Sequence, residues 1–126
     1  MKKAVKIILS ITAAIIVCTS LLCGVMIYKT EYRLTDKGTE LSPDGKYSVL
    51  FQMVGEPDWP FGATTVRATV TDIETGEKIE VIQTDIHDDG AVLRDYNWEV
   101  KWEEDEVEII FIGSEQEDKG YIVALD

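Results

Sequence analysis

Residues 64–86 read TTVRATVTDIETGEKIEVIQTDI, and this stretch decides the fold class. In its first half, Val66, Ala68 and Val70 alternate with polar or charged residues, which is the period of a β-strand with one buried face. The central ETGE places a glycine in a tight turn, and the second half has the composition of a partner strand. We therefore predict an antiparallel hairpin over these residues.

The chain beyond residue 41 repeats this pattern. Further alternating segments, separated by turn sequences, occur at residues 46–54, 97–103, 106–112 and 120–125. Residues 91–93 are compatible with one more short strand. Strands at this spacing, without helical periodicity, predict an all-β fold: a small antiparallel β-sandwich or barrel of six to seven strands.

The N-terminal segment is of a different kind. Residues 7–28 are 22 consecutive residues without a charge, and Lys2, Lys3 and Lys6 precede them. A helix of that length spans about 33 Å, enough for the roughly 30 Å hydrocarbon core of a bilayer. The preceding lysines predict a cytoplasmic N-terminus at residues 1–6 and a C-terminal domain outside the cytoplasmic membrane.

Three interpretations of the apolar segment are open. The favoured one is an uncleaved, single-pass signal anchor at residues 7–28. Cleavage of a signal peptide after Ser20 is an alternative, because the residues before that position are small. Lipidation of Cys18 or Cys23 is disfavoured, because a valine and a leucine precede them where a lipoprotein needs a small residue. Each interpretation exports the domain.

The chain after the apolar segment is strongly acidic. From residue 29 onward there are nine basic and 24 acidic residues, a net charge of −15. Such a charge repels nucleic acid and anionic lipid headgroups, which argues against nucleic-acid binding. Both cysteines lie in the apolar segment, so the domain is expected to be held by packing alone. Residues 29–40 are polar and aperiodic and predict a stalk, which leaves residues 41–126 as the β-domain.

An acidic stretch surrounds the single histidine, His87. Asp85, His87 and Asp89 match the start of an EF-hand loop, but Tyr96 stands where that loop needs a glutamate. The favoured interpretation is a solvated turn. The alternative is a calcium- or other cation-binding surface domain of different loop geometry, with the ligands Asp85, Asp88, Asp89 and Asp95. A second acidic run, residues 103–106, is predicted as a charged hairpin turn that discourages edge-to-edge association.

The most unusual segment is GEPDWPFG at residues 55–62. Its two prolines exclude a regular strand, and it carries two aromatic residues in a predicted connection. In the favoured interpretation, Trp59 and Phe61 fold back and cap the open end of the sandwich. In the other, Trp59, Pro60 and Phe61 are exposed and bind a partner.

The residue inventory disfavours catalysis. Outside the apolar segment there is one histidine and no cysteine, and the serines at 42, 48 and 114 form no Ser/His/Asp pattern. Paired carboxylates serve glycosidases, but a domain this small lacks their cleft. We expect no enzyme and no cofactor. We expect a membrane-tethered accessory or binding module for an envelope protein or a basic protein, with an immunity-like role against a basic toxin as one version.

Four motifs carry a family resemblance: SPDGKY at residues 42–47, WPFG at 59–62, NWxVxW at 97–102 and GxEQxD at 113–118. Together they resemble short, membrane-anchored β-domain proteins of Gram-positive bacteria, over most of residues 41–125. That family has no assigned activity or site residues. The resemblance therefore implies only an architecture, with one N-terminal anchor and one extracytoplasmic domain.

Overall fold

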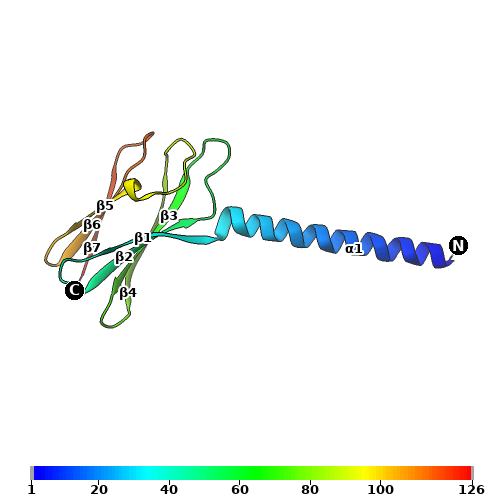
Figure 1. Ribbon diagram of the computed structural model, residues 1–126, viewed down its shortest axis with the longest axis horizontal. Coiled ribbons are helices and arrows are strands. Elements are labelled where there is room, and N and C mark those ends of the chain that lie inside the picture. Colours follow the sequence, from blue (N-terminus) through cyan, green and yellow to red (C-terminus); the bar gives the residue numbers. More distant parts are fainter. Residues whose placement is uncertain (1, 126) are drawn as a thin grey trace.

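The structure is a computed structural model that describes residues 2–125. In these residues one long helix is followed by seven strands, which form two antiparallel sheets of four and three strands (Figure 1). The sheets pack face to face around one core. The predicted fold class, a small antiparallel β-sandwich or barrel of six to seven strands preceded by one N-terminal helix, is confirmed, and the two separate sheets make it a sandwich.

The helix is α1 (Lys2–Ile27), and one π-helical turn, η1 (Tyr28–Tyr32), continues it. None of the described residues of either segment is buried by the rest of the chain. Residues Lys2–Tyr32 are long and apolar enough to cross a membrane, and a signal sequence meets the same criteria. A helix that is apolar on all sides needs an apolar surrounding, which a lipid bilayer provides.

The two sheets are built from consecutive strands. The first contains β1 (Leu34–Leu41), β2 (Tyr47–Val54), β3 (Thr64–Asp72) and β4 (Lys78–Ile86), in that order. The second contains β5 (Trp98–Trp102), β6 (Glu106–Phe111) and β7 (Lys119–Ala124). The chain crosses between the sheets through residues 87–97, which end in a short 3-10 helix, η2 (Asp95–Asn97). The predicted hairpin is confirmed as β3–β4.

Two sequence predictions are corrected by the strand assignment. The predicted stalk at residues 29–40 is occupied by η1, Arg33 and most of β1, which pairs with β2 from Leu34 to Leu41. The sandwich therefore begins two residues after the helical segment ends. Residues 91–93 lie outside any strand, and the seventh strand is β1 instead.

The start of the β2–β3 loop is bound directly to the end of the helical segment and to Arg33, the residue that follows it. The Gly55 N–H donates to the Arg33 carbonyl at 2.7 Å, and the Glu56 N–H donates to the Thr30 carbonyl at 2.8 Å. Figure 1 shows the β2–β3 loop on the side of the sandwich from which α1 leaves. The β1–β2 and β5–β6 turns lie at the opposite end, called the distal end below.

The core lies between the two sheets. Its aromatic centre is Phe51, which stacks on Trp98 with ring centroids 4.3 Å apart and meets Phe111 edge-on at 6.2 Å. Trp98 is buried and Trp102 half-buried, which confirms the inward face predicted for residues 97–103. The other buried apolar side chains are Val49, Met53, Val66, Ala68, Val70, Ile86, Leu93, Val107, Ile109, Val123 and Leu125.

The β1 strand is shaped by the indole of Trp98. The register of β1 against β2 shifts between Asp36 and Gly38, and a Cβ on Gly38 would lie 2.7 Å from a carbon of the Trp98 ring. The Trp98 Nε1–H donates to the Glu40 carboxylate at 3.3 Å. A glycine is therefore needed where β1 crosses the ring.

We expect Gly38→Ala to lower the free energy of unfolding by about 1–3 kcal/mol, because an added methyl group overpacks a filled core. Urea unfolding of the full chain in detergent measures the change. Gly120→Ala is the matched control, because a Cβ there meets only the carboxylate of Glu108, at 3.1 Å. Equal stability of Gly38→Ala and the wild type would contradict the packing of β1 against Trp98.

Candidate functional site

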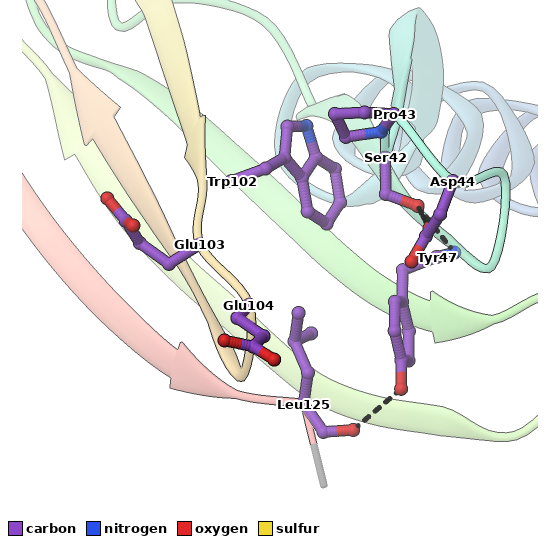
Figure 2. Close-up of a pocket in the computed structure, with 8 residues that line it drawn as sticks. All are labelled: Ser42, Pro43, Asp44, Tyr47, Trp102, Glu103, Glu104 and Leu125. Atoms are coloured by element: carbon purple, nitrogen blue, oxygen red, sulfur yellow. Dashed lines mark hydrogen bonds between the residues drawn. The ribbon is translucent and has the colours of Figure 1, made fainter.

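The distal end of the sandwich carries a shallow hollow of about 250 Å³. Figure 2 shows the ring of Trp102 and the ring of Tyr47 lining it, with Leu125 beside them and the carboxylates of two turns near its edge. The lining residues are Ser42, Pro43, Asp44, Tyr47, Trp102, Glu103, Glu104 and Leu125. The hollow therefore joins the β1–β2 turn to the β5–β6 turn, one from each sheet.

The β1–β2 turn is fixed by its own hydrogen bonds. The Ser42 hydroxyl donates to the Asp44 carboxylate at 2.6 Å and accepts the Tyr47 N–H at 3.0 Å. The Gly45 N–H donates to the Ser42 carbonyl at 3.0 Å. Across the hollow, the Tyr47 hydroxyl donates to the Leu125 carbonyl at 3.0 Å, as Figure 2 shows. The wall of the hollow is thus held in one geometry.

The charges around the hollow are negative. The pKa of Asp44 lies below its ordinary value, because the carboxylate accepts hydrogen bonds from the Ser42 hydroxyl and the Lys46 N–H. Asp44 is therefore ionised at neutral pH, and it is exposed, as are Glu103 and Glu104. Aromatic faces beside carboxylates suit a cation, which both kinds of group attract.

The size of the hollow limits what it can hold. Sites for small organic ligands usually occupy about 300–1,000 Å³ and enclose most of the ligand. The distal hollow is smaller and open, so it fits one side chain of a larger partner better than a free cofactor. An adjoining hollow of about 400 Å³ shares Leu125 but is otherwise lined by Asp72, Glu77, Lys78 and Ile79, and the lysine makes it less suited to a cation.

The four aspartates predicted as a cation site are not brought together. Asp85 lies on β4 and accepts the hydroxyl hydrogen of Thr65, its neighbour on β3, at 2.7 Å. Asp89 lies in a turn with a positive φ of 54°, and Asp95 begins η2. Among residues 2–125, no group of three or more His, Cys, Asp or Glu side chains is placed to hold a metal ion. The predicted ligand set is therefore corrected.

Asp88 instead holds two loops together. Its carboxylate accepts the Ser114 N–H at 2.9 Å and the side-chain amide of Asn97 at 3.3 Å. These bonds, the Ser114 N–H first, place the pKa of Asp88 below its ordinary value. The Asn97 side chain also accepts the Arg94 N–H at 2.8 Å and donates to the Ile112 carbonyl at 2.9 Å. Asp88 therefore stabilises the segment that crosses between the two sheets.

The aromatic loop does not cap the sandwich. Trp59 is 92% exposed and Phe61 is 71% exposed, so the favoured interpretation from the sequence is wrong. Leu93, from the crossing segment, is the loop side chain that enters the core, with 1% exposure. The three residues predicted as a partner contact, Trp59, Pro60 and Phe61, are all exposed at the helix side of the domain.

Sequence reasoning missed the distal hollow. It identified the turn at residues 42–45 and the charged turn at residues 103–106, but nothing in their spacing indicates that they meet. Trp102 was predicted as core, and its half-buried ring also lines the hollow. Comparison of the chain with known proteins found no matching family model, curated protein or solved structure.

Proposed function

We propose that this protein is a single-pass, membrane-tethered binding module whose distal hollow takes a basic side chain of a partner in the cell envelope. In this proposal α1 remains in the cytoplasmic membrane, with its lysine-bearing end in the cytoplasm and the sandwich outside. The distal end then faces away from the lipid. The observation that carries the proposal is the hollow itself, where two aromatic rings and three carboxylates meet at that end.

The chemistry of the hollow favours lysine or arginine over other side chains. Both side chains stack their alkyl stems or guanidinium plane on aromatic rings and pair their charge with carboxylates. The net negative charge of the whole domain attracts a basic protein before contact and raises its association rate. A secreted basic protein, including a toxin from which the cell protects itself, is a partner of this kind.

The test uses a lysine-rich peptide as the probe and the full chain in lipid nanodiscs. We expect Glu103→Gln combined with Glu104→Gln to weaken peptide binding about fivefold to tenfold at physiological salt, because each lost charge removes up to about 1 kcal/mol of attraction. Isothermal titration calorimetry measures the dissociation constant. Both glutamates are exposed, so the fold should be unaffected.

The matched control is Glu115→Gln combined with Glu117→Gln. These exposed residues lie in the β6–β7 loop, away from the distal hollow, and the charge change is identical. We expect affinity within about twofold of the wild type, because charges beyond about a Debye length are screened. An equal loss of affinity in both double variants would show diffuse attraction and contradict the hollow as the binding site.

A further inference from the structure

The β2–β3 loop presents two large aromatic side chains from a fixed backbone. The Asp58 N–H donates to the Ala63 carbonyl at 3.0 Å, and the Gly62 N–H donates to the Asp58 carbonyl at 2.7 Å, which closes the turn. Trp59 and Phe61 project from this turn, 92% and 71% exposed. Trp98 and Trp102, by contrast, pack in or against the core. Contiguous exposed apolar surface marks sites of contact with proteins or membranes.

The same loop is clamped to the end of the helical segment. Its first residues bond to the carbonyls of Thr30 and Arg33, and Gly55 has a positive φ of 66°. A Cβ on Gly55 would collide with the Thr30 carbonyl oxygen, so this close approach requires glycine. Thr30 and Trp59 line one common hollow, together with the loop residues between Glu56 and Trp59. The loop cannot move away from the helix without breaking these contacts.

The depth of this attachment follows from the length of the helix. The uncharged residues 7–28 cross about 33 Å, and the hydrocarbon core is about 30 Å thick. At about 1.5 Å per residue, Thr30 and Arg33 lie only about 3 Å and 8 Å beyond Tyr28. Each headgroup layer is about 5–7 Å thick. The attachment point at Thr30, which accepts the Glu56 N–H, therefore falls within the headgroup layer, and the one at Arg33 lies at about its outer edge.

We propose that Trp59 and Phe61 insert into the headgroup layer of the membrane that α1 crosses. Tyr28 and Tyr32, both exposed on the last turns of the helical segment, lie at the same level. Together the four rings form an aromatic belt of the kind that fixes proteins at a membrane interface. The inference rests on the proposed membrane-spanning role of α1. Its consequence is a sandwich held in one orientation, with the distal hollow facing away from the lipid.

The charge of the loop selects the lipid. Glu31, Glu56 and Asp58 line the hollow beside Trp59 and repel anionic headgroups. A zwitterionic headgroup places both charges at this level and accepts an indole N–H through its phosphate or carbonyl oxygens. Phosphatidylcholine vesicles are therefore the probe membrane.

The experiment measures where the exposed tryptophan lies. The full chain is reconstituted in phosphatidylcholine vesicles, and the Trp59 signal is the fluorescence of the wild type minus that of Trp59→Phe. We expect a nitroxide near the headgroup to quench this signal about twofold more than one near the acyl-chain end, and aqueous iodide to quench it about threefold less than free tryptophan. In a Trp59→Phe background, Leu41→Trp places an exposed tryptophan at the distal end, where iodide should quench it and nitroxide lipids should not.

Resistance to alkaline carbonate extraction separates this inference from the proposed function. If the chain stays in the vesicles and Trp59 is quenched by iodide like free tryptophan, the inference is overturned while the anchor stands. A loop that is covered by a protein partner in cells would also give this result, because the vesicles contain no partner. If the chain itself is extracted, α1 does not span the bilayer and both proposals fail. Retention with preferential headgroup quenching supports both.

Discussion

Phe51→Ala should lower the free energy of unfolding by about 3–5 kcal/mol, which is the range for truncating a buried phenylalanine. Phe51 is 0% exposed and lies at the centre of the core, stacked on Trp98 and edge-on to Phe111. The truncation removes the aromatic contacts and leaves a cavity between the sheets. Small domains have only about 5–15 kcal/mol of stability in total, so a large fraction is lost.

The measurement is equilibrium unfolding in urea, followed by tryptophan fluorescence with the full chain in detergent. Phe51→Leu is the matched control: it keeps most of the side-chain volume and loses the stacking, so we expect a loss of about 1–2 kcal/mol. A loss below about 1 kcal/mol for Phe51→Ala would be incompatible with two sheets meeting across this ring.

Asn97→Ala is expected to lower the free energy of unfolding by about 2–4 kcal/mol, because partners inside the protein lose their hydrogen bonds. Asn97 is 1% exposed, and its side chain bonds to the Arg94 N–H and the Ile112 carbonyl. These bonds join the crossing segment to the end of β6. In the alanine variant, the Arg94 N–H and the Ile112 carbonyl lose the hydrogen bonds that the amide side chain provides.

Asn97→Asp separates hydrogen bonding from shape. The new carboxylate keeps the bond from the Arg94 N–H but faces the Ile112 carbonyl and the Asp88 carboxylate. Burial beside like charge raises its folded pKa, so the destabilisation is largest at neutral pH and decreases as the pH falls and the group is protonated. Thermal unfolding at pH values of about 5 and 7 measures this trend. A variant as stable as the wild type at neutral pH would contradict the buried network.

The strands that could be predicted are those with a buried apolar face. The β3–β4 hairpin and the strand of Trp98 and Trp102 are confirmed, because burial of one face imposes a period of two on the sequence. β1 could not be predicted in this way. It is an edge strand with a bulge, and Gly38 makes room for an indole that comes from the other sheet.

The environment of loop residues could not be predicted, because it depends on contacts distant in sequence. The cap interpretation of Trp59 and Phe61 failed because Leu93 enters the core and the helix end holds their loop outside. Asp88 looked like a metal ligand because a carboxylate in an acidic loop has that composition, whereas its partners are Ser114 and Asn97. The distal hollow forms only where turns of both sheets meet.

The topology of the chain across the membrane can be tested with single cysteines. Cys18→Ala and Cys23→Ala remove both native cysteines. Glu117→Cys then places one thiol on an exposed loop of the sandwich, and Lys3→Cys places one near the N-terminus. We expect the N-terminal thiol to react with a membrane-impermeant maleimide only after the cells are permeabilised, because the lysine-bearing end stays inside.

Maleimide labelling of Glu117→Cys in intact cells, with the mass of the labelled chain measured, tests whether the sandwich is tethered outside the membrane by an uncleaved helix. We expect labelling without permeabilisation, on a chain that retains residues 1–28. Labelling that requires lysis would place the sandwich in the cytoplasm, and a labelled chain that starts after Ser20 would show that the helix is cleaved. Either result would contradict the membrane-tethered module.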